Sequence, residues 1–105
     1  MKTDKVFAML GMATKAGKVV SGEFATEKAV KSAHAYLVIL ASDASDNTKK
    51  MFTNMCNFYE VPMFICGTKE ELGHAMGKEL RASLAITDPG FAKSLTGLLK
   101  ERSSE

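Results

Sequence analysis

Residues 21–43 of the chain combine two hydrophobic patterns, a helical period followed by an unbroken apolar run. The positions that recur at helical spacing, and that we expect on one face of a helix, are Phe24, Ala25, Lys28, Ala29 and Ser32. The apolar run at residues 36–41 (YLVILA) is too short to span a membrane and is typical of a strand buried on both faces. A helix that leads directly into a buried strand indicates an α/β layer fold.

Folds of this class place their sites at the edges of such a helix and strand. Ser21 and Gly22 precede the helix, and we expect the Ser21 hydroxyl to cap it, because the first N–H groups of a helix lack partners within it. Residues 42–44 follow the strand. We therefore expect functional residues at the turn before the helix and at the end of the strand.

The beginning of the chain predicts another helix and a short strand. Thr3 or Asp4 is suited to cap a helix that runs to about Lys15, and residues 18–20 (KVV) are typical of a strand. The side chains expected to face the core from this helix are Val6, Phe7, Met9, Leu10 and Ala13.

The segment after the central strand predicts a third helix and a second apolar strand. Ser45 or Asp46 is suited to begin the helix. The side chains expected on its buried side are Met51, Phe52, Met55, Cys56 and Tyr59. Residues 63–66 (MFIC) follow a proline and precede a glycine, which predicts an interior strand.

The last part of the chain predicts a helix, a strand and a final helix. Thr68 and Glu71 have the spacing of a capping box, in which each side chain accepts a hydrogen bond from the other residue's backbone. Residues 80–87 are predicted to form a strand, and Asp88 followed by Pro89 is typical of a helix start. The side chains expected to be buried in the final helix are Phe91, Leu95, Leu98 and Leu99.

These elements alternate without a linker, a repeat or a low-complexity segment. Five helices and about four strands predict an α/β protein, a three-layer α/β/α sandwich with a central mixed sheet of about four strands. The 105 residues are enough for one core, so we expect a single domain over residues 1–105.

Composition adds little to this picture. An apolar fraction of 46% and a charged fraction of 25% are ordinary for a soluble globular protein. The first residues (MKTDK) lead into no apolar segment that resembles a signal peptide, and no stretch approaches the length of a membrane helix. We therefore expect a cytoplasmic protein with no membrane partner.

The charge is small but unevenly distributed. The chain carries a net charge of +2, whereas its first 31 residues contain six lysines and three acidic residues, so the rest of the chain sums to −1. One interpretation is a solvated helical face on which lysines provide solubility. The other is a positive surface for an anionic partner. The sequence leaves both open.

No catalytic motif is present, so we expect no catalytic residue, no cofactor, no metal and no enzymatic activity. Cys56 and Cys66 form no CxxC pair and are predicted to be reduced, buried thiols; a small redox enzyme that uses them is the weakest hypothesis. His34 and His74 fit no metal spacing, and helix capping explains an aspartate such as Asp43 more simply than catalysis does.

Four segments, taken in their order and spacing, resemble a known family: residues 17–22 (GKVVSG), 28–30 (KAV), 37–44 (LVILASDA) and 72–79 (LGHAMGKE). The chain resembles the ribosomal protein L7Ae/L30e/S12e/Gadd45 family from about residue 5 to residue 92, and is most similar to its small bacterial RNA-binding members. The resemblance implies the same α/β/α sandwich. It also implies binding of kink-turn RNA, a sharply bent duplex in which sheared G·A pairs flank a bulge.

The resemblance implies two RNA-binding elements. In the first, Gly22 lets the backbone approach RNA, Lys28 reaches guanine edges or phosphate, and Lys31 holds a neighbouring phosphate. The second is the loop at residues 77–82, in which Leu80 packs against a flipped-out nucleotide. The complete set of RNA-binding residues expected is Lys15, Lys18, Ser21, Gly22, Glu23, Lys28, Lys31, Lys78, Glu79, Leu80 and Arg81.

The chain departs from the family pattern at two positions. Phe24 and Ala25 stand where many members have an Asn and a Glu that hydrogen-bond to the G·A pairs. Glu23 either replaces these contacts or stabilises the helix N-terminus. A base can stack on Phe24, but its helical spacing favours a core position.

The expected partner is therefore a structured RNA, with ribosomal RNA and an mRNA leader as the candidates and the ribosome as a candidate assembly. The alternative is a protein-interaction module that kept the fold but lost kink-turn specificity, since a fold does not fix a function. We expect a monomer, because the pattern leaves no apolar stripe unexplained.

Overall fold

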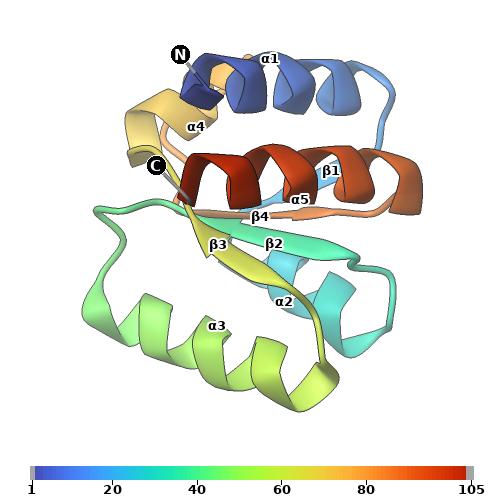
Figure 1. Cartoon of the computed structure of the whole chain (residues 1–105). Helices are drawn as coiled ribbons and strands as arrows, with labels where there is room; N and C mark the ends of the chain where they lie inside the picture. The colour runs from blue at the N-terminus through green and yellow to red at the C-terminus, as the bar shows by residue number, and fades with distance from the viewer. Residues whose placement is uncertain (1, 104–105) are drawn as a thin grey trace.

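The computed structural model describes the backbone of residues 2–103 and the side chains of residues 4–101. In chain order its elements are α1 (Lys2–Lys15), β1 (Val19–Ser21), α2 (Glu23–Lys31), β2 (Leu37–Leu40), α3 (Asp46–Tyr59), β3 (Met63–Ile65), α4 (Lys69–Ala75), β4 (Ser83–Ile86) and α5 (Pro89–Ser103). The helices lie on both faces of the sheet, α1, α4 and α5 on one and α2 and α3 on the other (Figure 1). The predicted α/β/α sandwich with a four-stranded mixed sheet is confirmed.

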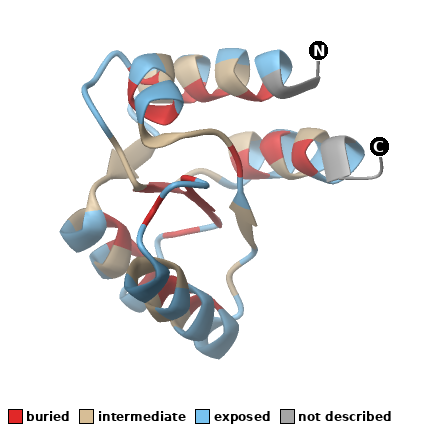
Figure 2. Cartoon of the chain, turned by 90° about the vertical axis from the view of Figure 1, so that its left-hand side faces the viewer, coloured by how far each residue is buried: buried red, intermediate tan, exposed pale blue. Residues whose placement is uncertain are grey.

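The sheet brings one set of strand ends together. The strand order is β1-β4-β2-β3, with β2 parallel to β3 and β4 antiparallel to both β1 and β2. β1, β2 and β3 therefore run in the same direction, and all three end where β4 begins. We call this edge the carboxyl end of the sheet; it lies at the left of Figure 1 and faces the viewer in Figure 2.

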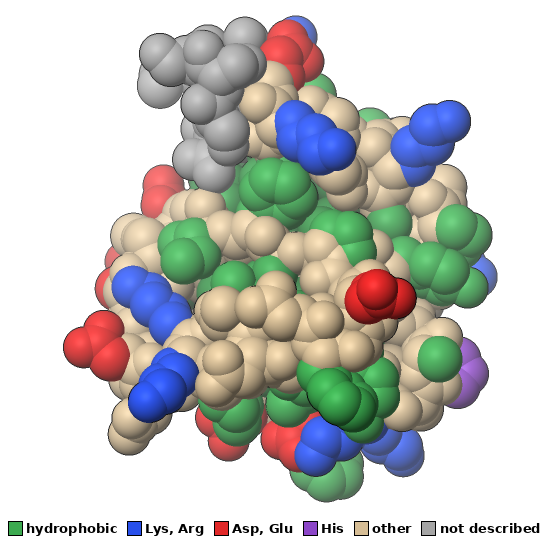
Figure 3. All heavy atoms as spheres, turned by 60° about the horizontal axis from the view of Figure 1, so that its bottom comes forward, with side chains coloured by type: hydrophobic (Ala, Val, Ile, Leu, Met, Phe, Trp, Pro, Cys, Tyr) green, Lys and Arg blue, Asp and Glu red, His purple; other side chains and the backbone are tan. Residues whose placement is uncertain are grey.

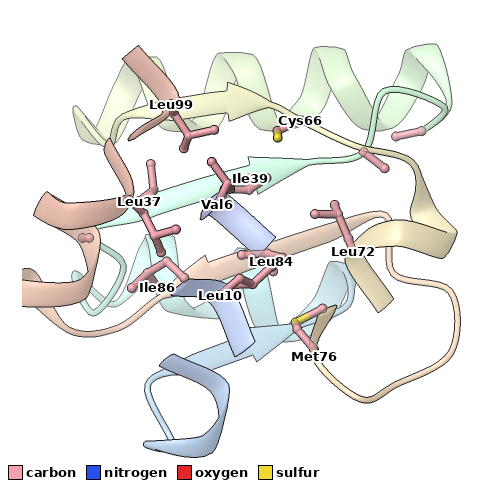
Figure 4. Packing of buried hydrophobic residues seen from close by; sticks show 14 residues of the cluster. Val6, Leu10, Leu37, Ile39, Cys66, Leu72, Met76, Leu84, Ile86 and Leu99 are labelled. Carbon is pink, nitrogen blue, oxygen red and sulfur yellow. The ribbon is translucent and has the colours of Figure 1, made fainter. Parts of the chain in front are cut away.

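Two hydrophobic cores cover the two faces of the sheet. Successive side chains of a strand point to opposite faces, so Leu37 and Ile39 of β2 enter one core, and Val38 and Leu40 enter the other. Figure 4 shows the first core, in which α1, α4 and α5 direct side chains toward β2 and β4. The second core packs α2 and α3 around the fully buried Phe52. The expectation that the central strand is buried on both faces is confirmed.

The predicted interior position of residues 63–66 is wrong. β3 pairs only with β2, so it is an edge strand, and its Ile65 side chain is 41% exposed. The aromatic residues at two element ends also differ from the prediction. Tyr36 precedes β2 and is 46% exposed, and Tyr59 is 41% exposed at the end of α3, edge-on to the Phe58 ring.

Side-chain caps at helix starts agree with the sequence in three places. The Ser45 hydroxyl accepts a hydrogen bond from the Thr48 N–H at the start of α3, and the capping box at the start of α4 is complete. The Asp88 carboxylate accepts one from the Phe91 N–H at the start of α5. The predicted caps of α1 are wrong, because that helix already includes Lys2.

Helix α2 is rotated relative to the predicted stripe. The residues that it buries are Thr26, Ala29 and Val30, whereas Phe24 is 80% exposed. The predicted core position of Phe24 is therefore wrong. In this short helix several phases fit the apolar residues, and packing against β1 and β4 selects the one that turns Phe24 outward. No helix in the described part of the chain is long and apolar enough to cross a membrane.

Candidate nucleic-acid interface

The carboxyl end of the sheet joins two segments that are far apart in the sequence. The Arg81 Nε donates a hydrogen bond to the Ser21 Oγ at 3.0 Å, across 60 residues of chain. The Gly22 N–H donates to the Ser83 carbonyl at 3.0 Å. The start of α2 and the loop at residues 77–82 therefore form one continuous surface, which we call the α2–loop surface.

The start of α2 has no side-chain cap. Its N-cap residue is Gly22, with φ 93° and ψ 157°, a conformation that residues with a Cβ rarely adopt. The predicted cap by Ser21 is wrong, because Ser21 ends β1 and its hydroxyl accepts from Arg81 instead. Since no side chain caps the helix, its first N–H groups are available to an anionic ligand.

The loop at residues 77–82 is held in place by backbone contacts. The Lys78 N–H donates to the Gly73 carbonyl at 2.8 Å, and the Arg81 N–H donates to the Lys69 carbonyl at 3.1 Å. A Cβ on Gly73 would overlap the carbonyl of Glu79, so only glycine allows the loop to lie this close to α4.

This packing leaves the tip of the loop exposed. The Lys78, Glu79 and Leu80 side chains all face solvent, and Leu80 is 61% exposed. The loop therefore presents an apolar group beside a cation on a fixed backbone.

The outer side of α2 carries aromatic and charged groups side by side. A shallow groove of about 340 Å³ is lined by Phe24, Glu27, Lys28, Lys31 and Ser32. Lys31 Nζ lies 2.8 Å from a Glu27 carboxylate oxygen, and this hydrogen bond raises the pKa of Lys31. No carboxylate within residues 4–101 forms an ion pair with Lys28. Figure 3 views the side formed by α2 and α3, where hydrophobic side chains lie beside Lys, Arg and acidic ones.

The structure does not bring all of the predicted residues together. Ser21 contacts Arg81, and Gly22 contacts Ser83. Glu23 begins α2, and Lys28 follows within two turns. Lys31 is the last residue of α2, away from the carboxyl end.

Lys15 and Lys18 lie beyond the other end of β1, where the Lys18 carbonyl accepts from the Thr87 N–H. A strand of this length spans about 10 Å, so these two lysines are separated from the loop. The RNA contacts assigned to all eleven residues stay predictions.

The described residues offer little for catalysis. Among them, no group of three His, Cys, Asp or Glu side chains is placed to hold a metal. Both thiols are buried, and burial raises the pKa of Cys56 to about 11, which keeps it protonated at neutral pH although a thiolate is the reactive form. The Asp43 carboxylate accepts a hydrogen bond from the Lys69 N–H at 2.8 Å, a structural role at the start of α4.

Three residues that shape this surface were not predicted to do so. Gly73 stands inside a helix, where a glycine signals close backbone approach. The exposure of Phe24 and the carbonyl contact of Ser83 follow from the rotation of α2 and the start of β4. Neither the exposure of Phe24 nor the contact of the Ser83 carbonyl is indicated by the residues next to it in the sequence.

Comparisons with protein families and curated proteins give consistent matches. A model of the ribosomal protein L7Ae/L30e/S12e/Gadd45 family matches residues 4–96. The chain is 47% identical over 93 residues to "RNA-binding protein YlxQ" of Bacillus subtilis (strain 168), covering 89% of this chain and 93% of that protein. It is 36% identical over 96 residues to "RNA-binding protein YlxQ" of Enterococcus faecium, covering 91% and 92%. These relatives are named as RNA-binding proteins and not as enzymes, which confirms the prediction of a non-enzymatic protein.

Two solved structures show the same fold. A protein of unknown function from Bacillus halodurans C has a TM-score of 0.89 and 36% identity, covering 91% of this chain and 97% of that one. The Giardia lamblia 15.5kD RNA binding protein has a TM-score of 0.81, covering 95% and 88%. Its identity is 20%, so that likeness shows the fold alone.

Proposed function

The chain belongs to the ribosomal protein L7Ae/L30e/S12e/Gadd45 family, and on this premise we propose that it is an RNA-binding protein that recognises kink-turn RNA through the α2–loop surface. The observation that carries this proposal is the contact between the two segments, made by Arg81 with Ser21 and by Gly22 with Ser83. It gives one rigid surface with an uncapped helix start, an exposed cation and an exposed leucine. The proposal is also supported by the two relatives that are named as RNA-binding proteins.

The physical basis is the shape of bent RNA. The major groove of an A-form duplex is too narrow for side chains, but a kink opens it and turns bases outward. The start of α2 can then enter, with its N–H groups toward phosphate and Lys28 toward a guanine edge or a phosphate. Leu80 packs against the flipped-out nucleotide. Arg81 uses one N–H for Ser21 and one for the Leu80 carbonyl, so other guanidinium donors remain for the RNA backbone.

Glu23 is the residue on which base preference depends in this proposal. Phe24 and Ala25 cannot donate to or accept from a base edge, whereas the exposed carboxylate of Glu23 lies in the first turn of α2. One good bidentate base contact provides about 1–3 kcal/mol of discrimination. We therefore expect a preference for kink-turn RNA that depends on Glu23 and on the backbone, and an affinity that depends mainly on Lys28.

The RNA partner that fits this surface is a structured cellular RNA. We propose that the protein acts in the cytoplasm, as a monomer, on ribosomal RNA or an mRNA leader, and that the ribosome is the assembly with which it associates. Sedimentation of a cell lysate would test this directly. Co-migration with ribosomes that is lost on RNase treatment is the expected result, and co-migration with no RNA species would contradict it.

The proposal is tested by binding to a labelled kink-turn duplex. The control is the same duplex with its G·A pairs replaced by Watson–Crick pairs, and both are titrated at two salt concentrations. Tighter binding to the kink-turn at both salts is expected. Equal binding to both duplexes that weakens steeply with salt would indicate phosphate contacts alone. No binding to either would overturn the proposal and leave a protein-interaction module as the function of the fold.

A further inference from the structure

Phe24 and Lys28 form an exposed ridge along α2. They are four residues apart and therefore neighbours on the helix surface. The groove of about 340 Å³ described above borders this ridge on the side of Glu27 and Lys31. A second hollow of about 390 Å³ borders it on the side of Val20, Ala29 and Thr87. An aromatic ring beside an unpaired lysine thus stands between two shallow, mainly apolar hollows.

The Phe24 side chain has no packing role within the fold. Its ring is 80% exposed, so it contributes little to the core, and the buried face of α2 is made by other residues. Phe58 on α3 is similarly exposed, at 79%, but it lies edge-on to its neighbour Tyr59 and borders neither hollow. Phe24 is therefore distinguished by its surroundings and not by its exposure.

One cation lies beside the Phe24 ring, four residues along the same helix, while the exposed Glu23 carboxylate precedes it in the first turn. The negative charge of Glu27 is paired with Lys31, which leaves Lys28 as the cation beside the ring. Phe24 also lies two residues after Gly22, so the ridge begins in the first turn of α2, next to the N-cap residue of the α2–loop surface. Unpaired nucleotides combine a phosphate with a flat base, and bases stack on aromatic rings whatever their sequence.

We propose that Phe24 and Lys28 bind unpaired nucleotides that extend from the kinked duplex, with a base stacked on the Phe24 ring and its phosphate beside the Lys28 ammonium. This inference rests on the proposed function and extends it to the single-stranded flank of the RNA. Phe24 then provides affinity that is tolerant of sequence, at a position where many family members have a residue that reads bases.

The test compares a blunt kink-turn duplex with the same duplex carrying a short unpaired pyrimidine extension, placed in turn at each strand end next to the kink. The variants are Phe24→Ala, Phe24→Trp and, as the matched control, Phe58→Ala. Stacking on an aromatic side chain contributes about 1–3 kcal/mol per base, which corresponds to about 5- to 150-fold in affinity. We expect one of the extensions to tighten binding to the parent protein by a factor in this range.

The Phe24→Ala variant should lose the gain from the extension and keep its affinity for the blunt duplex. Phe24→Trp should retain the gain, and Phe58→Ala should behave as the parent. Both phenylalanines are exposed, so thermal unfolding of all variants should match the parent.

The outcomes separate this inference from the proposed function. If the parent binds the kink-turn but gains nothing from either extension, the inference is wrong and the proposed function stands. The same holds if Phe24→Ala weakens blunt and extended duplexes equally. If the parent binds neither duplex but binds the pyrimidine strand alone in a Phe24-dependent way, the proposed function fails, and the inference is wrong about the kinked duplex although Phe24 stacks on bases. Binding to no RNA overturns both, and leaves the ridge as a surface for a protein.

Discussion

Helices α2 and α4 begin at the same end of the sheet, but their first turns are built in opposite ways. At α4, the Thr68 hydroxyl accepts from the Glu71 N–H, the Glu71 carboxylate accepts from the Thr68 N–H, and the Asp43 carboxylate accepts from the Lys69 N–H. At α2, Gly22 has no side chain, and none of the side chains within residues 4–101 provides a cap.

The capped start of α4 contributes to the stability of the fold, whereas the uncapped start of α2 is free to bind a ligand. A closed helix start satisfies its own N–H groups and contributes about 1 kcal/mol to folding. An open start forgoes that contribution and can bind an anion, which the positive end of the helix dipole also favours. In this protein the closed helix holds the loop at residues 77–82, and the open helix lies beside that loop.

Charge reversal at the open helix should have the largest effect on RNA binding. Lys28→Glu removes a contact worth about 1–3 kcal/mol and adds repulsion from phosphate, so we expect affinity for kink-turn RNA to fall about 100-fold or more. The melting temperature should fall by a few degrees at most, because Lys28 is exposed and forms no ion pair within residues 4–101, while a carboxylate in the last turn of α2 is disfavoured by the helix dipole. Fluorescence anisotropy and thermal unfolding measure the two quantities.

The matched control for this variant is Lys50→Glu on α3. Lys50 is also an exposed helical lysine, but it lies outside the α2–loop surface. We expect it to bind RNA nearly as the parent does. Equal losses in the two variants would mean that net charge, and not the position of Lys28, determines binding.

A substitution in α4 should affect RNA binding at the α2–loop surface, because α4 holds the loop at residues 77–82. In Gly73→Ala the new Cβ would overlap the Glu79 carbonyl, so the loop must move away from α4. Such overpacking costs about 1–3 kcal/mol of folding free energy. Losing the proposed Leu80 contact, about 1.5–3 kcal/mol for a buried leucine, should weaken RNA binding about 10- to 150-fold.

Chemical denaturation and RNA titration give the two values for Gly73→Ala. Its control is Gly97→Ala, which meets no atom within 4 Å in α5. That variant should be neutral or more stable by up to about 1 kcal/mol. Unchanged RNA binding by a folded Gly73→Ala protein would show that the loop position is not needed.

The smallest effects on RNA binding should come from alanine substitutions at the N-cap residues of α2 and α4. Gly22→Ala forces a Cβ into a φ of 93°, which costs about 1–3 kcal/mol of folding free energy. It should weaken RNA binding about tenfold, because the new Cβ would stand where we propose that RNA backbone approaches. Thr68→Ala should cost about 1 kcal/mol of stability and leave RNA binding unchanged. An equal loss of binding in both would contradict the contrast between the helices.

The candidate site illustrates which features could be predicted. The capping box at Thr68 is predictable because it is a local motif of a few residues, and the structure confirms it. The cap predicted for Ser21 is wrong, because the partner of its hydroxyl, Arg81, lies 60 residues away in the sequence. The core position predicted for Phe24 is wrong, because an amphipathic period in a nine-residue helix does not fix the rotation of the helix.

The sequence by itself determined the number, type and order of the elements, because hydrophobic period and helix caps depend on residues close together in the chain. It also identified the family, since that needs only the order and spacing of short segments. The tertiary structure decided that β3 is an edge strand, that Phe24 faces outward, and that Lys15 and Lys18 lie away from the loop. Each of these depends on contacts between distant segments, which the local pattern does not encode.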